Sequence, residues 1–175
     1  LGNLLLGNDE GEAGLEVTLL GPTLRFEEDC WIAITGADLG ARWNGAEAPL
    51  WETLSFRAGD RLSFGTPRRG VRAYVTVAGG VEVAPVLSSR STYLRAKLGG
   101  LDGRALQSGD RVRVRGMPSC HRRLPAEFVP TYDSGPLHVV LGPQDERFTR
   151  EGVDTLLSSA YEVRSDSDRM GIRLE

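Results

Sequence analysis

Hydrophobic and polar residues alternate with a period of two along several segments before residue 115. The alternation is clear in residues 15–19, 61–64 and 72–78, and it is typical of half-buried β-strands. Residues 30–35 are nearly all apolar, which predicts a strand covered on both faces. Residues 111–115 alternate valine with arginine, so this strand has either a solvated arginine face or an arginine ladder that binds a ligand.

Helical signals are confined to the two ends of the chain. Residues 1–7 resemble the last turns of a helix, with residues 4–6 packed inward and Gly7 as a left-handed cap. Residues 151–159 carry a short apolar stripe, and the Thr149 hydroxyl is placed to cap the helix start. Strands therefore outnumber helices, and the fold class we predict is mainly β.

The prolines and glycines predict turns and divide the chain. Asn44-Gly45 is a favourable two-residue hairpin turn. Residues 116–136 hold several prolines and little periodicity, which predicts a linker between a first domain at 1–115 and a second at 137–175. In the second domain we expect strands at 137–141, 161–164 and 171–174. The pattern Leu-Gly-Pro…Arg-Phe occurs before and after the linker, which indicates that the second domain begins as a copy of the first.

The inward positions of the alternating segments predict the hydrophobic core. We expect these residues to be inside or mostly so: Val17, Leu19, Ile32, Ile34, Phe64, Tyr74, Val75, Val77, Val112 and Val114.

Composition narrows the classes of protein. The 175 residues carry a net charge of −3, which argues against a nucleic-acid-binding surface. No run of 18 apolar residues occurs, which excludes a transmembrane helix. Cys30 and Cys120 are far apart and form no zinc motif. A single disulfide between them stays open, but a reducing, cytoplasmic location is the simpler interpretation.

Three polar clusters are the candidate binding segments. Gly79-Gly80 follows the clearest strand and allows close approach of a ligand or of another strand. Residues 88–93 combine hydroxyls with Arg90, whose guanidinium can hold a carboxylate. Residues 165–171 contain Asp168 and Arg169, which can bind an ion or a ligand or pair with each other. For the second and third clusters the alternative is a turn that only sets the backbone conformation. No metal motif is complete.

Six segments of the chain occur in an order that is typical of one known family. They are GNLLLGN at 2–8, LEVTLLGPTLRF at 15–26, ITGADLGARWNG at 34–45, the long stretch 73–110, LGPQDERFT at 141–149 and SDRMGIRLE at 167–175. Together they resemble the family called the 5-oxoprolinase C subunit, allophanate hydrolase subunit 2, the biotin-dependent carboxyltransferase-domain family or the KipA family. Members are about twice as long, so by this resemblance the chain is an internal fragment.

The resemblance implies a fold and a set of binding residues. The fold would be a cyclophilin-like antiparallel β-barrel, with the start of a second, related half. The family motifs fall on Gly79 and Gly80, where the backbone approaches a ligand, and on a set of polar side chains that would bind substrate. These side chains are Arg90, Ser91, Thr92, Tyr93, Gln144, Asp168 and Arg169.

The resemblance also implies a function and partners. The first expectation is an ATP-dependent 5-oxoprolinase that opens 5-oxoproline to glutamate together with the A and B subunits of the complex, of which the B subunit is KipI-like, that is, similar to a kinase inhibitor. The first alternative is the carboxyltransferase part of a biotin-dependent urea carboxylase. The second is a non-catalytic, KipA-like module that antagonises a kinase inhibitor. We expect the chain to bind no cofactor itself, to be inactive alone and to self-associate through residues 137–175.

Overall fold

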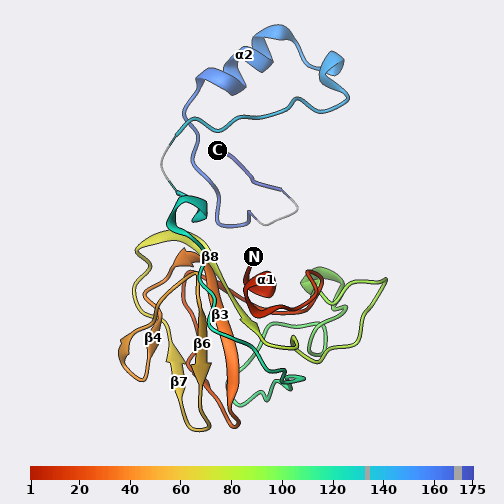
Figure 1. Ribbon diagram of the computed structural model, residues 1–175. Coiled ribbons are helices and arrows are strands. Elements are labelled where there is room, and N and C mark those ends of the chain that lie inside the picture. The colour runs from red at the N-terminus through yellow and green to blue at the C-terminus, as the bar shows by residue number, and fades with distance from the viewer. Residues whose placement is uncertain (133–134, 168–170) are drawn as a thin grey trace. The chain divides into compact units, whose positions relative to one another are not determined.

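The computed structural model describes residues 1–132, 135–167 and 171–175, and the chain forms two compact units, residues 1–133 and 134–175. The first unit is mainly β (Figure 1). Its helix and strands are α1 (Gly2–Leu6), β1 (Leu15–Thr18), β2 (Leu24–Arg25), β3 (Cys30–Asp38), β4 (Arg42–Trp43), β5 (Ala46–Glu47), β6 (Thr53–Phe56), β7 (Arg61–Ser63) and β8 (Arg69–Val77). Short 3₁₀ turns follow at η1 (Leu94–Ala96) and η2 (Ala126–Phe128).

The strands form two antiparallel four-stranded sheets, ordered β1-β8-β3-β6 and β2-β7-β4-β5. The predicted mainly β class is therefore confirmed. The predicted closed barrel is not: among the described strands each sheet keeps two open edges. The reason is that β2, β4 and β5 are only two residues long, which leaves too few ladder hydrogen bonds to join the sheets.

Strand β3 lies inside the first sheet and is covered on both faces, as its apolar run predicts. It pairs with β6 through Ile32 and Leu54 and with β8 through Ile34 and Val75. Ile32 and Ile34 point into the main core. Ala33, on the opposite face, packs against Leu5 and Leu6 of α1.

Helix α1 contacts β3 and β8 and covers this second face (Figure 1). Leu5 and Leu6 are buried, whereas Leu4, expected to pack inward, is 50% exposed because one turn of helix offers only one inward face. Gly7 ends the helix in the left-handed region at φ 76°, as predicted.

An aromatic stack joins the two sheets through the core. Phe56 on β6 is fully buried, and its ring lies 4.5 Å from Trp43 on β4 and 4.5 Å from Phe26 after β2. Phe56, Leu62 and Leu39 are missing from the predicted core, although none of them is exposed by more than 2%.

The predicted core is only partly right. Val17, Ile32, Ile34, Val75 and Val77 are buried, and Phe64 and Val114 pack against them at half-exposure. Val112 is also half-exposed.

The prediction is wrong for two core residues, Leu19 and Tyr74, which are exposed. Leu19 is 49% exposed because the chain turns away after β1, with Leu19 itself at φ 55°. Tyr74 is 38% exposed because it lies on the α1 face of β8, where the five-residue helix covers Thr76 but extends no further.

The Asn44-Gly45 turn forms as predicted. Both residues have positive φ, 50° and 89°, and they connect β4 to β5.

Two further turns share one design. The Asp60 carboxylate accepts a hydrogen bond from the Arg57 N–H, and the Asp110 carboxylate accepts one from the Gln107 N–H. The sequence Gly-Asp-Arg occurs at 59–61 and again at 109–111, so this sequence repeat marks a repeated turn structure.

The turn aspartates are acidic beyond their ordinary range. Hydrogen bonds from the Arg104 side chain and the Gln107 N–H lower the pKa of Asp110 to about 2. The Arg57 N–H and the Asn44 amide lower the pKa of Asp60.

Part of the segment expected as a linker packs on the first unit. Thr53 on β6 donates its N–H to the Arg122 carbonyl at 2.9 Å, and its hydroxyl donates to the Cys120 carbonyl at 2.9 Å. Leu124 N–H donates to the Trp51 carbonyl at 2.8 Å. Residues 120–124 are thus an extended segment hydrogen-bonded to the start of β6 and to the residues before it. The division into domains at 1–115 and 137–175 stays a prediction.

The predicted valine–arginine strand at 111–115 is reduced to one bridge, between Val114 and Val81. Its arginine face is solvated over most of its length, since Arg111 and Arg113 are exposed. Arg115 is also exposed, but its guanidinium forms an ion pair that belongs to the site described below.

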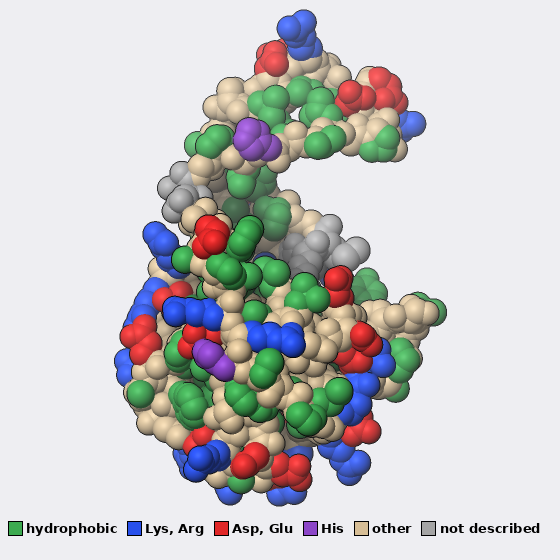
Figure 2. All heavy atoms as spheres, in the orientation of Figure 1, with side chains coloured by type: hydrophobic (Ala, Val, Ile, Leu, Met, Phe, Trp, Pro, Cys, Tyr) green, Lys and Arg blue, Asp and Glu red, His purple; other side chains and the backbone are tan. Residues whose placement is uncertain are grey.

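The second unit contains η3 (Asp145–Arg147) and α2 (Arg150–Ser158). The Thr149 hydroxyl accepts the Gly152 N–H at 3.1 Å, which confirms the predicted cap. The strand predicted at 137–141 does not form, and the pairing of 161–164 with 171–174 is reduced to the bridge Val163–Leu174. A strand needs a partner for its backbone groups, and Leu137 and Val140 are more than 90% exposed. Figure 2 shows hydrophobic side chains on the surface of the second unit.

Neither helix combines the length and the apolar character that a bilayer span requires, within the described residues.

Candidate functional site

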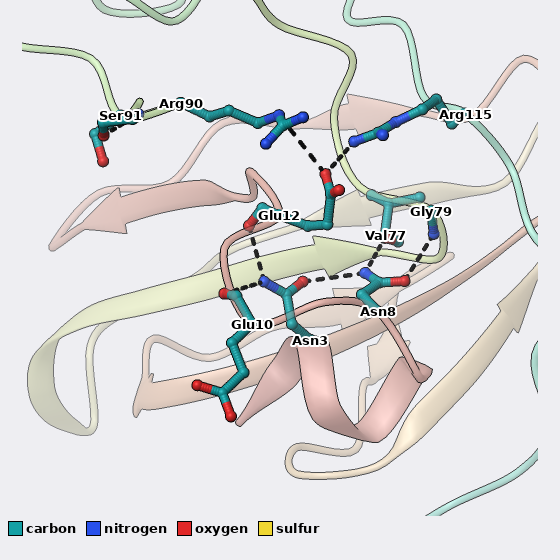
Figure 3. Close-up of polar contacts among 10 residues, drawn as sticks. Asn3, Asn8, Glu10, Glu12, Val77, Gly79, Arg90, Ser91 and Arg115 are labelled. Carbon is teal, nitrogen blue, oxygen red and sulfur yellow. Dashed lines mark hydrogen bonds and ion pairs between the residues drawn. The ribbon is translucent and has the colours of Figure 1, made fainter. Parts of the chain in front are cut away.

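Three segments that are distant in the sequence meet beside the end of β8. The loop between α1 and β1 contributes Glu12, the loop after β8 contributes Arg90, and the segment after residue 110 contributes Arg115 (Figure 3). We call these three residues the Glu12 cluster. The Glu12 carboxylate forms ion pairs with both guanidinium groups, at 3.9 Å from Arg90 Nε and in closer contact with Arg115. The cluster carries one more positive than negative charge.

Two asparagines at the ends of α1 hold the loop that carries Glu12. The Asn3 amide donates to the Glu10 and Glu12 carbonyls at 3.1 and 2.8 Å. The Asn8 amide donates to Asn3 Oδ1 at 3.0 Å and to the Val77 carbonyl at 2.8 Å. This chain of bonds fixes the loop backbone to the end of β8.

The Gly79-Gly80 turn is fixed by the same asparagine. Asn8 Oδ1 accepts the Gly79 N–H at 2.8 Å (Figure 3). Both glycines have positive φ, 83° and 77°. A Cβ on Gly79 would lie 3.1 Å from Met117 Cγ, and a Cβ on Gly80 would lie 2.5 Å from Glu12 Oε2. The close approach predicted for this pair therefore occurs, and it is made by other parts of this chain.

Of the predicted segment 90–93, only Arg90 joins the cluster. The Ser91 side chain lies apart from Glu12 (Figure 3), and the Ser91 N–H donates to Ser89 Oγ at 3.1 Å. Thr92 packs against Gly100, where a Cβ would meet its hydroxyl. Tyr93 pairs with Leu98 across a turn and is 46% exposed.

The remaining predicted residues lie in the second unit. Gln144 precedes η3 and is exposed. Asp168 and Arg169 lie outside the described residues.

Sequence reasoning missed Asn3, Asn8, Glu12 and Arg115. Asn3 and Asn8 lie within GNLLLGN, where an asparagine on each side of a short helix is a usable signal for capping-type hydrogen bonds. Arg115 lies in the arginine ladder, for which a ligand site was one of the two interpretations. Glu12 is one of several acidic residues in its loop, and nothing in the local pattern distinguishes it.

Of the two cysteines, Cys30 is a poor candidate for a nucleophile. Both are free, and burial together with the nearby Asp29 charge raises the pKa of Cys30 to about 11. His121 Nδ1 lies 3.3 Å from the Thr53 carbonyl, so one ring nitrogen faces the backbone. These contacts favour a structural role for Cys30 and for His121.

Two further observations concern ligand binding elsewhere. No group of three His, Cys, Asp or Glu side chains in the described part of the chain is arranged to hold a metal ion. An open groove of about 440 Å³ lies beside β6 and is mostly apolar. Its lining residues are Leu50, Trp51, Arg123, Leu124, Pro125, Ala126 and Val129.

The two arginines of the Glu12 cluster have the chemistry to bind an oxyanion. Guanidinium groups bind carboxylates through paired N–H donors. In addition, the Gly79-Gly80 turn that follows β8 brings backbone without side chains next to Arg115 and Glu12.

Comparison with known proteins gives consistent results. Residues 1–175 match the family described as "Carboxyltransferase domain, subdomain A and B". The chain is 38% identical over 182 aligned residues to the C subunit of 5-oxoprolinase from Escherichia coli, covering 100% of this chain and 56% of that protein. It is 36% identical to a putative urea carboxylase of Emericella nidulans, covering 99% of this chain and 15% of that protein.

A solved structure agrees with these sequence matches. The crystal structure of K. lactis urea amidolyase superposes with a TM-score of 0.89 at 30% identity, covering 99% of this chain and 11% of that one. The chain thus spans a little over half of the bacterial relative and a small part of the fungal ones.

Proposed function

This chain belongs to the family of carboxyltransferase domains with subdomains A and B, and from that premise we propose that it serves in an ATP-dependent 5-oxoprolinase. The reaction is the opening of the 5-oxoproline ring to glutamate. The partners in this proposal are the A subunit and the kinase-inhibitor-like B subunit of the complex, in the cytoplasm. The chain itself binds no cofactor, and the complex uses ATP.

The observation that carries the proposal is the excess positive charge of the Glu12 cluster in a chain 38% identical to the C subunit of a 5-oxoprolinase. 5-Oxoproline is a small cyclic amide that bears a carboxylate, whereas urea is neutral. A site for the former needs a cation, and Arg90 supplies one. We propose that Arg90 binds the substrate carboxylate.

The other predicted residues keep the roles proposed for them. Ser91, Thr92, Tyr93 and Gln144 would donate hydrogen bonds to substrate oxygens, and Asp168 would orient Arg169 or accept the ring N–H. We also propose that the two sheets belong to a cyclophilin-like barrel whose related second half begins in residues 137–175.

The test uses the whole protein with its A and B partner subunits. We expect 5-oxoproline to stimulate ATP hydrolysis and to be converted to glutamate, and the present chain alone to show no turnover. Stimulation by urea plus biotin, with no response to 5-oxoproline, would refute the proposal.

That second outcome would support biotin-dependent carboxyl transfer, the alternative favoured by the 36% identity to a putative urea carboxylase and the structural likeness to urea amidolyase. Urea and the ureido ring of biotin are planar amides, so the same hydrogen-bond donors suit them.

One substitution distinguishes a non-catalytic, KipA-like docking role from a substrate site. If Arg90→Ala leaves 5-oxoproline hydrolysis intact and the kinase-inhibitor-like partner still binds, Arg90 is no part of a substrate site and the docking role gains support. If hydrolysis is lost while that partner still binds, the site interpretation holds.

A further inference from the structure

The Glu12 side chain is more buried than either of the two arginines that it contacts. Its side chain is 11% exposed, compared with 33% for Arg90 and 41% for Arg115. One atom, Oε2, faces both guanidinium groups (Figure 3). The arginines therefore converge on a single position, and that position is filled by an oxygen of this chain.

Gly80 forms the floor of this position. At φ 77°, its missing side chain would point at the carboxylate, because a Cβ there would lie 2.5 Å from Glu12 Oε2. Any other residue at position 80 would thus fill the space that the oxygen occupies. We call the space bounded by Gly80, Arg90 and Arg115 the carboxylate seat.

Glu12 does not use all the hydrogen-bond donors of the carboxylate seat. The Nε atom of Arg90 is buried, and it has no hydrogen-bond acceptor among the described residues, since its 3.9 Å separation from Oε2 is too long for a hydrogen bond. A buried charged donor without an acceptor is costly. A ligand carboxylate entering between the arginines can offer one oxygen to each guanidinium, which a single shared oxygen cannot do.

The loop lets Glu12 leave the seat by side-chain rotation alone. Its backbone is fixed by the bond from Asn3 to its carbonyl at 2.8 Å and by its own N–H, which donates to the Asp9 carbonyl at 3.1 Å. Among the described residues, the side chain has only its ion pairs with the two arginines to lose. Its withdrawal would expose two adjacent cations and the backbone of Gly80.

We propose that the carboxylate seat is a ligand site for a small carboxylate and that Glu12 is its internal substitute, displaced when the ligand binds. The inference deepens the proposed function and rests on it only for the identity of the carboxylate, 5-oxoproline. Competition by Glu12 weakens the apparent affinity in proportion to the fraction of time that the seat is open. Removing the Glu12 charge therefore strengthens ligand binding.

The experiment measures binding of 5-oxoproline to the full 175-residue chain by calorimetry. Glu12→Gln should bind at least about tenfold more tightly than the unaltered chain, because the competitor is gone and both cations remain. Glu10→Gln is the matched control: it removes one negative charge from the same loop, and its side chain points away from the arginines (Figure 3). It should bind like the unaltered chain.

A neutral probe tests the chemistry of the ligand. The amide of 5-oxoproline keeps the ring and lacks the carboxylate, so it should bind neither the unaltered chain nor the Glu12→Gln variant. Equal binding of the acid and the amide, or equal affinity of the Glu12→Gln variant and the unaltered chain, would overturn the proposal.

A second measurement follows the arginines of the unaltered chain directly. In the unaltered chain, the ¹⁵Nε–H signals of Arg90 and Arg115 should both shift when 5-oxoproline is added, with assignments from Arg90→Lys and Arg115→Lys. If neither signal moves at saturating concentration, the seat is not a ligand site. The outcome is separable from the proposed function: tighter binding by Glu12→Gln without 5-oxoproline hydrolysis by the complex would keep the seat and reject the oxoprolinase.

Discussion

Asn8 is the residue whose removal tests the framework of the site most directly. Its amide makes three hydrogen bonds to described residues: it accepts from the Gly79 N–H at 2.8 Å and donates to the Val77 carbonyl and to Asn3 Oδ1 at 2.8 and 3.0 Å. Each such bond contributes about 1 kcal/mol net, and a buried group left unpaired adds to the loss. We expect Asn8→Ala to lower the free energy of unfolding by about 2–4 kcal/mol.

Asn8→Asp separates the acceptor from the donor role. The new carboxylate can still accept the Gly79 N–H, but its second oxygen would replace a nitrogen that is now 2.8 Å from the Val77 carbonyl oxygen. Repulsion there raises the carboxyl pKa in the folded state above its unfolded value of about 3.9. The destabilisation is therefore fully present above the folded pKa, and it declines as the pH falls from that value to the unfolded value of about 3.9.

The assay is urea unfolding followed by tryptophan fluorescence from pH 7 to pH 4. Asn8→Asp should gain stability relative to the unaltered chain as the pH falls, whereas the deficit of Asn8→Ala should stay constant. An Asn8→Ala variant within about 0.5 kcal/mol of the unaltered chain, the range of ordinary surface substitutions, would refute the role given to this amide.

Three other predictions follow from the fold. Asp110→Asn should destabilise the chain at pH 7, and in urea unfolding its deficit should shrink as the pH falls from the ordinary carboxyl value of 3.8 toward about 2, because the lowered pKa stabilises the folded state only above that window. Cys120 should react with a disulfide reagent at pH 8 far faster than Cys30, whose raised pKa of about 11 leaves about one thiolate in a thousand; equal rates in the matched Cys→Ser variants would contradict this. Gly36→Ala should lower the melting temperature markedly, because φ is 86° and the new Cβ would lie 2.6 Å from the Arg72 carbonyl oxygen in the central pair β3–β8; an unchanged melting temperature would count against it.

The strands and turns that the sequence predicts well are those specified by neighbouring residues. The apolar run at 30–35, the Asn44-Gly45 turn and the Thr149 cap each depend on a few consecutive positions, and all three are present. The segment 137–141 has an equally clear pattern but forms no strand, because a pattern cannot supply the partner strand that pairs its backbone.

The candidate site was harder to predict because its contacts are not local. Arg90 was identified from its hydroxyl-rich surroundings, yet Ser91 turns away and the actual partner is Glu12. Arg115 meets Glu12 across 103 positions of sequence. Neither spacing nor composition indicates which of many acidic and basic residues will meet at that distance, so the pair becomes visible only in the folded chain.

The pairing of β1 with β8 has a consequence for the order in which the chain folds. Leu15 pairs with Val75, so β1 leaves the ribosome before the other strands of its sheet and has no partner until β8 has been synthesised. Closing so long a loop is slow, and β1 and α1 must wait without a sheet to pack on. The ion pair between Glu12 and Arg115 forms later still, because Arg115 is translated after all of β1 to β8. The carboxylate seat is therefore completed only after both sheets have been synthesised, and a nascent chain released before residue 115 would carry a folded sheet with Glu12 missing one of its two cations.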